Sequence, residues 1–286
     1  MTPSRMPAAF IGHGSPMNTL ESNRYTQAWR RFGQAVPRPR AILVVSAHWF
    51  IGGSALTAMA NPRVIHDFYG FPQALFDFDY PAPGAPDIAE EIAAAVRPGA
   101  VALDRDSWGL DHGTWSVLAH MFPQADVPVL QLSIHAGEDI AYHVDLGRQL
   151  APLRERGILI VGSGNVVHNL RLVERSMPDT AFDWAADFDA QARQLMTASP
   201  GALARLASHP AYRLAVPTPE HFLPLAYLAG LASAAGEGAQ VLVEGGVMGA
   251  LTMTSFVLGC DPAMAGTGGG AAAPIPGGIA PQDTNT

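Results

Sequence analysis

Apolar residues occur along this chain in short unbroken runs that alternate with amphipathic stretches. The runs occupy residues 7–12, 41–50, 127–135, the first part of 157–170, 239–246 and 252–259. Continuous apolar runs of this length are typical of strands in a sheet that is covered on both faces. The pattern therefore predicts a set of buried strands.

The stretches between these runs predict helices. They lie at 20–33, 85–96, 109–122, 138–154, 181–207 and 216–231, the third and last of them beginning with a loop. Strands that alternate with helices are typical of an α/β fold. We expect a central, largely parallel or mixed sheet flanked by helices, with any metal site at the ends of the strands.

The pattern changes after Cys260, where Gly, Ala and Pro dominate the chain. No linker or internal repeat is visible before that point. We expect one catalytic domain over residues 1–260 and a disordered tail over 261–286.

Composition narrows the function classes. The formal net charge is −8 and no basic run occurs, which argues against nucleic acid or an anionic membrane as partner. The apolar stretch 245–259 is too short to span a membrane, and the N-terminus does not resemble a signal peptide. A single cysteine excludes an internal disulfide and fits a reducing compartment, so we expect a cytoplasmic protein.

Several of the ten histidines follow apolar runs directly. His13, His48 and His135 end predicted strands, His168 follows the "GSGN" turn, and His221 precedes an apolar helix. Ligands of open α/β sheets bind beyond the carboxyl ends of the strands. We therefore expect the side chains of His13, His48, His168 and His221 to converge.

Converging neutral imidazoles indicate a divalent metal, since imidazole nitrogen suits zinc and iron. Gly12 and Gly14 on either side of His13 would allow a sharp turn and close approach of a metal and substrate. A single histidine at a strand end is more often structural, so the prediction depends on the set. The sequence contains no G-x-S-x-G, phosphate-binding loop, H-E-x-x-H or complete dinucleotide fingerprint.

Six stretches, in order, carry a resemblance: "GHGSP", "VSAHW", "HDFYGFP", "GLDHGTW", "GSGNVVHNL" and "PTPEHFLPL". From about residue 8 to residue 258 the chain resembles the DOPA 4,5-dioxygenase group of class III extradiol ring-cleavage dioxygenases. The resemblance implies one α/β domain around a single divalent metal ion, Fe(II) or Zn(II). It also implies cleavage of a catechol ring beside its two hydroxyls with O₂.

The resemblance assigns roles to individual histidines. His13, His48 and His221 correspond to metal ligands, and His168 to a fourth histidine that acts as ligand or as acid and base. His112 corresponds to a catalytic histidine on the substrate side. Glu220 is the rival of His221 as ligand, because distant relatives bind iron through two histidines and a glutamate.

Two other functions stay open on the sequence alone. The first is a zinc-dependent hydrolase that uses the same histidines, and the second is a non-enzymatic binding protein of the same superfamily. The sequence does not define the catechol or the oligomeric state, and an oligomer is compatible with it.

Overall fold

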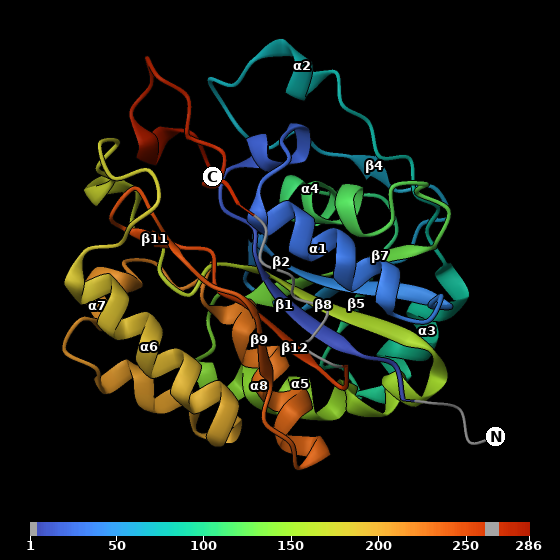
Figure 1. The fold of residues 1–286 in the computed structure, drawn as a ribbon. Helices are drawn as coiled ribbons and strands as arrows, with labels where there is room; N and C mark the ends of the chain where they lie inside the picture. The colour runs from blue at the N-terminus through green and yellow to red at the C-terminus, as the bar shows by residue number, and fades with distance from the viewer. Residues whose placement is uncertain (1–4, 261–268) are drawn as a thin grey trace.

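The computed structural model describes residues 5–260 and 269–286 (Figure 1). The strands are β1 Ala8–Gly12, β2 Ala41–Ile51, β3 Ala55–Thr57, β4 Arg63–Val64, β5 Ala102–Asp104, β6 Gly109–Leu110, β7 Val129–His135, β8 Ile158–Gly164, β9 Gln240–Val243, β10 Gly246–Val247, β11 Leu251–Thr252 and β12 Ser255–Leu258. The α-helices are α1 Arg24–Ala35, α2 Gln73–Phe76, α3 Pro86–Ala95, α4 His112–Met121, α5 Ile140–Leu150, α6 Asp183–Ala198, α7 Tyr212–Ala215 and α8 Leu223–Ala235. The 3₁₀ helices are η1 Pro16–Leu20, η2 Ala151–Arg156, η3 Leu170–Leu172, η4 Pro200–Ser208 and η6 Pro281–Asp283.

The described residues form an eight-stranded sheet in the order β5-β3-β7-β2-β8-β1-β12-β9. Its centre, β7-β2-β8-β1, is parallel throughout. The outer strands make it mixed, because β12 runs antiparallel to both β1 and β9, and β3 runs antiparallel to β7. The predicted α/β fold with a largely parallel or mixed sheet is confirmed.

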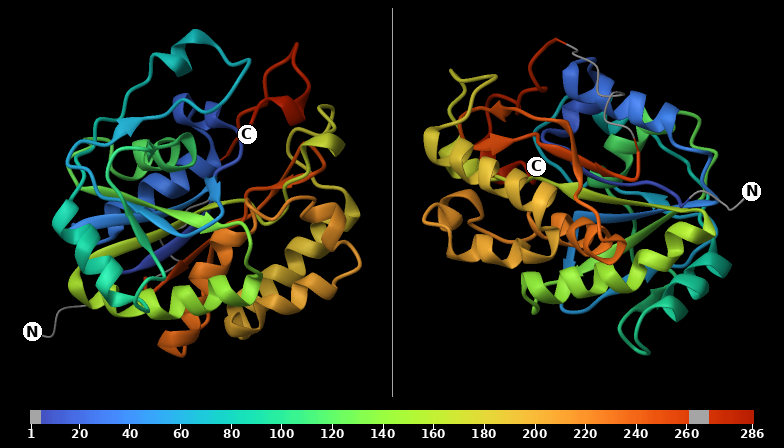
Figure 2. Two further views of the ribbon diagram at one scale, coloured as in Figure 1. Left: turned by 180° about the vertical axis from the view of Figure 1, so that it is seen from behind. Right: turned by 60° about the horizontal axis from the view of Figure 1, so that its bottom comes forward.

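Helices cover both faces of the sheet, as the two views in Figure 2 show. Strand β1 illustrates the consequence. Ala8 and Phe10 belong to the apolar cluster that includes α5, α6 and α8, while Ala9 and Ile11 belong to the cluster with α1 and α4. Successive side chains of a strand point to opposite faces, so a strand covered on both sides must be apolar throughout. This explains the unbroken apolar runs.

One predicted helix is shorter than its pattern suggested. The amphipathic stretch 181–207 forms α6 only as far as Ala198 and then continues as η4. Pro200 lacks a backbone N–H, and its ring disfavours the α conformation for the residue before it, so α6 ends at Ala198 and Ser199 is its C-cap.

Residues 269–286 differ from the disordered tail expected for 261–286. Residues 261–268 lie outside the described part of the chain. Residues 269–286 return to the domain, and Ala273, Ile275, Thr284 and Thr286 are buried there. Backbone hydrogen bonds hold this segment despite its low content of large apolar side chains, for example Ala273 N–H to the Asn18 side chain at 2.9 Å.

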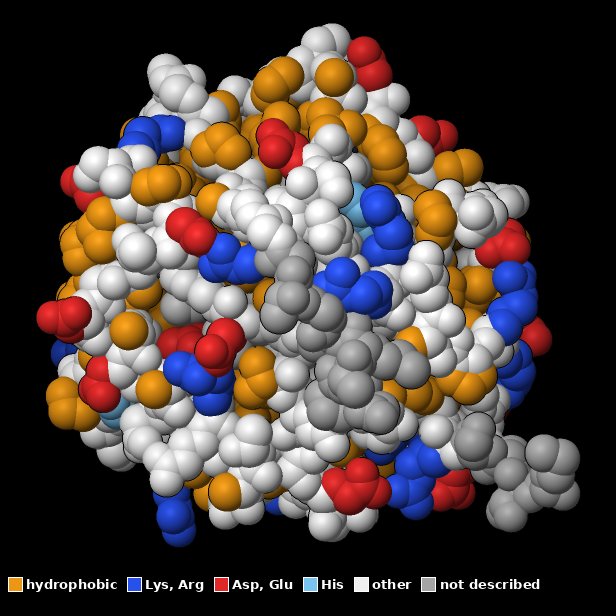
Figure 3. All heavy atoms as spheres, viewed as in Figure 1, with side chains coloured by type: hydrophobic (Ala, Val, Ile, Leu, Met, Phe, Trp, Pro, Cys, Tyr) orange, Lys and Arg blue, Asp and Glu red, His pale blue; other side chains and the backbone are white. Residues whose placement is uncertain are grey.

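Two surface observations complete the description. Within the described residues, no helix is both long and apolar enough to cross a membrane. On the face seen in Figure 3, acidic and basic side chains are interspersed.

Candidate functional site

Five imidazoles lie together at one edge of the sheet, among the described residues. His13 directly follows β1 and His48 lies near the end of β2, and β8 separates these strands in the sheet. The ring centroids of His13 and His48 are 5.2 Å apart. His221 lies 5.4 Å from His13, and His112 lies 3.8 Å from His48. The fifth ring, His168, stacks on His221 at 3.6 Å.

An irregularity in β2 sets the position of His48. The parallel pairing with β7 shifts register between Val45 and Phe50, so that the segment with His48 is not paired one to one. Bulges of this kind bend a strand and redirect a side chain, and they are frequent beside active sites. The His48 side chain is only 3% exposed.

The turn after β1 positions His13. Gly14 has φ +57°, a conformation that favours glycine. A Cβ on Gly12 would lie 2.7 Å from the backbone of Met253, and one on Gly14 would collide with the Met253 side chain. The expected role of these glycines, room for a metal and substrate, is therefore corrected: their missing side chains make room for Met253.

The end of β8 selects the tautomer of His13. Ser163 Oγ lies 2.9 Å from His13 Nδ1 and donates its own proton to the Gly113 carbonyl at 2.5 Å. The hydroxyl oxygen therefore accepts a hydrogen bond from Nδ1–H. A neutral His13 then carries no proton at Nε2, and this atom lies 3.3 Å from His48 Nε2.

Asp67 supports two of the imidazoles from behind. Its Oδ1 lies 3.0 Å from His112 Nδ1 and also accepts the backbone N–H of His112, while Oδ2 lies 3.4 Å from His48 Nδ1. Sequence reasoning did not assign a role to Asp67, although the "HDFYGFP" motif contains it. An acidic side chain in a largely aromatic loop was the available signal.

His112 is the first residue of α4, and Asp111 caps this helix by accepting the N–H of Thr114. Asp111 is buried and also accepts hydrogen bonds from Ser46 and Gln131. Burial, with the nearby charge of Asp67, raises the pKa of Asp111 to about 6. These hydrogen bonds connect the start of α4 to β2 and β7. They therefore place the imidazole of His112 beside that of His48.

His221 points toward the other rings, and Glu220 lies behind it. Glu220 Oε1 lies 3.3 Å from His221 Nδ1 and accepts the Thr218 hydroxyl at 2.7 Å. Burial acts to raise the pKa of Glu220, but the hydrogen bond and charge of His221 outweigh it and lower the pKa to about 2. The structure therefore brings His221, rather than Glu220, into the imidazole cluster.

The donor set fits a cation. The Nε2 atoms of His112, His168 and His221 are buried without a hydrogen-bond partner, and those of His13 and His48 face one another. Metal-binding histidines usually direct the second ring nitrogen to a carboxylate, a carbonyl or another polar group. His13, His48, His112 and His221 all show this pattern, through Ser163, Asp67 and Glu220.

Distances group three of the imidazoles most tightly. Among the described residues, ligand atoms of His13, His48 and His112 all lie within 4.8 Å of one another. This group shares His13 and His48 with the set expected from the sequence and contains His112 in place of His168 and His221.

Electrostatics favour the neutral form of three of the imidazoles. Burial lowers the pKa of His13, His48 and His168 well below the ordinary value, and repulsion from neighbouring imidazoles lowers it further. Metal binding requires unprotonated imidazoles. Near neutral pH these three rings can therefore bind a metal without first losing a proton. Burial also acts to raise the pKa of Asp67, but the charge and hydrogen bonds of His112 outweigh it and lower the pKa.

The other histidines lie elsewhere. His135 at the end of β7 accepts the N–H of Gly137, and His66 packs against Phe68 and Trp115. His135 ends a predicted strand but was not among the four histidines expected to converge, and it lies outside the cluster. His120, His143 and His209 make contacts in other parts of the fold.

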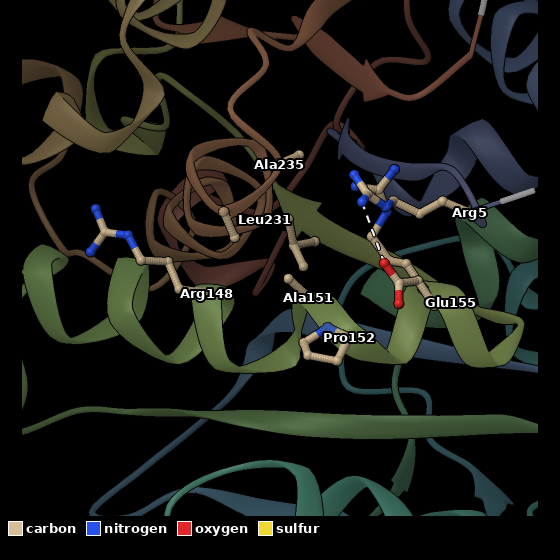
Figure 4. Close-up of a pocket in the computed structure, with 9 residues that line it drawn as sticks. Arg5, Arg148, Ala151, Pro152, Glu155, Leu231 and Ala235 are labelled. Carbon is tan, nitrogen blue, oxygen red and sulfur yellow. Dashed lines mark hydrogen bonds and ion pairs between the residues drawn. The ribbon is translucent and has the colours of Figure 1, made fainter.

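A cavity of about 370 Å³ opens beside the imidazoles. His168 and His221 line it, together with Arg171, Glu220 and residues of the C-terminal segment. Another cavity, of about 240 Å³, lies between α5, η2 and α8 and is lined by Arg5, Arg148 and Glu155 (Figure 4). This second cavity contains none of the clustered histidines. The cavity beside His168 and His221 is therefore the candidate substrate cavity.

Comparison with known families identifies the class of enzyme. Residues 7–255 match the family model described as the catalytic LigB subunit of aromatic ring-opening dioxygenase. The chain belongs to the LigB family. This confirms the resemblance to extradiol ring-cleavage dioxygenases and the prediction of an oxygen-using, ring-opening enzyme. The alternatives of a zinc hydrolase and a binding protein are set aside.

Relatives of this LigB-family chain cover most of its length. A 4,5-DOPA dioxygenase extradiol of Escherichia coli (strain K12) is 48% identical over 263 residues, which is 91% of this chain and 97% of the relative. A 4,5-DOPA dioxygenase extradiol of Beta vulgaris is 36% identical and covers 84% of this chain and 92% of its own. The crystal structure of an uncharacterized protein from Escherichia coli K12 superposes with a TM-score of 0.77 at 43% identity. That comparison covers 89% of this chain and all of the other.

Proposed function

We propose that this LigB-family enzyme cleaves the ring of DOPA or a related catechol beside its two hydroxyls, with O₂ as co-substrate. The observation that carries the proposal is the set of buried, unpartnered Nε2 atoms beside a cavity large enough for a small aromatic molecule. The names of the bacterial and plant relatives support DOPA as the first catechol to test.

One divalent ion is the proposed cofactor, held by His13, His48 and His221, with His168 beside it. The motifs support His221 as the third ligand, and its Nδ1 faces the carboxylate of Glu220. The distances favour His112 as the alternative third ligand. We propose Fe(II) rather than Zn(II) for catalysis, because zinc has no redox chemistry and the reaction reduces O₂.

When bound, a divalent ion would lower the pKa of a catechol hydroxyl and bring the substrate and O₂ together. The remaining steps fall to the protein. His168 is neutral with a free Nε2, so it can accept a proton from a catechol hydroxyl in the adjoining cavity. Its position at the cavity wall suits this role better than a closed four-histidine metal site would.

His112 is the proposed second catalytic group. Asp67 accepts a hydrogen bond from its Nδ1 and stabilises positive charge on the ring. Nε2 is then directed at the site, where a proton on it would stabilise negative charge that develops on substrate oxygen. Because the imidazoles are buried, bulk water is kept from these groups and their electrostatic effects are strengthened.

Oxygen uptake by protein loaded anaerobically with Fe(II) tests the proposal. We expect uptake and a yellow ring-fission product with at least one catechol of a panel that includes DOPA, and none with the same catechols after zinc loading. No uptake and no coloured product across the panel would refute the proposed function. The single cysteine leads us to propose a reducing compartment, such as the cytoplasm, as the site of action.

A further inference from the structure

The segment 269–286 lies beyond the residues matched by the family model and against the active site. The family match ends at residue 255, and the solved bacterial structure is covered completely by 89% of this chain. In Figure 1 the segment is the red chain that ends close to the loop that carries α2. Its position raises the question of what this enzyme gains from it.

The first half of the segment is anchored on two sides. Ala273 N–H donates to Asn18, and the Ser15 hydroxyl donates to the Pro274 carbonyl at 3.0 Å. Both partners belong to the turn and short helix that follow His13. On the other side, Arg175 donates to the carbonyls of Ile275 at 2.6 Å and Pro276 at 2.8 Å.

The second half reaches the residues that support the imidazoles. Tyr69 N–H donates to the Thr284 carbonyl at 3.0 Å, and the Asn285 side chain donates to the Asp67 carbonyl. Thr284 is fully buried and Thr286 is 1% exposed. The segment therefore packs against the same loop that places Asp67 behind His48 and His112.

The same residues line the active-site cavity. Gln282, Asn285 and Thr286 face a cavity whose other wall includes His168 and His221. His168 also hydrogen-bonds to the backbone of Thr286. Since His168 Nε2 has no partner, this bond occupies Nδ1 and leaves Nε2 directed at the site.

The polar character of the cavity indicates what it recognises. Two side-chain amides from the segment lie in the same cavity as the guanidinium of Arg171 and the carboxylate of Glu220. Amides and a guanidinium are suited to a carboxylate, and amide oxygens and a carboxylate are suited to an ammonium group. An unsubstituted or alkyl-substituted catechol has no charged substituent for these groups to bind.

We propose that Gln282, Asn285 and Thr286 form the outer wall of the substrate cavity and select catechols with a charged, hydrogen-bonding ring substituent. Gln282 and Asn285 are the specificity-determining side chains, and Thr286 is a positioning residue for His168. This inference rests on the proposed function, because it concerns the catechol that the same site accepts.

The test compares KM and kcat for DOPA, 3,4-dihydroxyphenylpropanoate and 4-methylcatechol. For Gln282→Ala and Asn285→Ala we expect KM for the two charged substrates to rise about tenfold, the effect of one lost hydrogen bond to a charged group. KM for 4-methylcatechol should stay within about twofold. Asp283→Asn is the matched control, because Asp283 is exposed between them and does not line the cavity; its values should equal those of the parent.

A chain that ends at residue 268 tests the segment as a whole. We expect a lower kcat on all three substrates, since His168 loses its partner, and loss of the preference for charged substituents. Circular dichroism shows whether this truncated variant folds. If it does not fold, the KM values of Gln282→Ala and Asn285→Ala test the proposal instead. Unchanged KM ratios in the point variants overturn the proposal. A truncated enzyme with a higher kcat and an unchanged substrate preference also overturns it, because that result indicates that the segment inhibits the enzyme by blocking the cavity.

A binding measurement separates this proposal from the proposed function. Calorimetry under argon, with zinc-loaded protein, measures the affinity for DOPA and for 4-methylcatechol without turnover. If the full-length protein cleaves no catechol but prefers DOPA, and Asn285→Ala abolishes that preference, only the proposed function fails. If the enzyme cleaves catechols but binds both ligands with equal affinity, in the full-length protein and in Asn285→Ala, the specificity role of the cavity wall is refuted and the proposed function stands.

Discussion

Nε2 of His13 lies 3.3 Å from Nε2 of His48, close enough to share a proton or a cation. Ser163 occupies Nδ1 of the first ring, and the carboxylate of Asp67 faces Nδ1 of the second. With the proton of each ring on Nδ1, the two Nε2 lone pairs face one another and repel unless a cation lies between them. The pair is therefore the centre of the proposed metal site, and it leads to the first prediction.

Replacement of either residue, His13→Ala or His48→Ala, should abolish stoichiometric metal loading, because each removes one of the two facing nitrogens at the centre of the site. Plasma mass spectrometry of protein purified without chelator measures the metal content. His135→Ala is the matched control, since His135 also ends a strand but lies outside the cluster. Retention of one equivalent of metal in both site variants would refute the assignment.

The third ligand can be decided between His221 and His112. We expect His221→Ala to lose the metal, and His112→Ala to keep it while kcat falls by a factor of about 100, typical of a lost acid–base group. Metal content and single-turnover rates are measured on the same preparations. The reverse pattern, with metal lost only from His112→Ala, would show that the distance grouping identifies the ligand set.

Asp67→Asn should weaken the site through its two supported imidazoles. The amide keeps the shape but loses the charge that orients His48 and His112. Replacing a residue that supports metal ligands typically lowers metal affinity or activity by roughly 10- to 100-fold. A titration with Fe(II) and the initial rate of oxygen uptake measure the two effects. Asp77→Asn, on the exposed end of the same loop, should leave both unchanged.

His143 predicts how stability depends on pH away from the metal site. Burial lowers its pKa from 6.5 to about 4. Below 6.5 the unfolded chain takes up a proton that the folded protein does not, so the free energy of unfolding falls as pH decreases toward 4. The slope from this residue reaches about 1.4 kcal/mol per pH unit.

The comparison is made by urea unfolding of metal-free protein across that pH range. His143→Gln should keep a hydrogen-bonding partner for Tyr227, whose hydroxyl lies 3.1 Å from Nδ1, and should show a shallower pH dependence. Parallel curves for the parent and variant would contradict the assignment of this slope to His143.

Gly12→Ala should destabilise the protein by about 1–3 kcal/mol, the usual cost of an overpacked core. The added methyl group would lie 2.7 Å from the backbone of Met253. Met253 lies between β11 and β12, and β12 pairs with β1. Thermal and urea unfolding measure the change. Gly52→Ala is the control, because a Cβ there meets nothing within 4 Å. Equal stability of the two variants would show that β1 and the Met253 segment can separate without cost.

The hydrophobic pattern alone determined the sheet and the convergence of most of the proposed site. Unbroken apolar runs require a sheet covered on both faces, and parallel strands in such a sheet end at one edge. His13 and His48, at the ends of β1 and β2, were therefore predictable as neighbours. His135 ends β7 in the same way but remains outside the cluster, because strand order and local register decide which strand ends face one another.

Tertiary structure alone decided what holds these imidazoles in place. Asp67 lies in an irregular loop, and the partnership of Ser163 with His13 joins residues 150 positions apart. Neither contact has a periodic signal in the sequence. The segment 269–286 shows the same limit: its composition predicts disorder, because few large apolar side chains are available to bury. Its position depends on backbone groups that Asn18, Tyr69 and Arg175 satisfy, and only the folded chain brings those partners together.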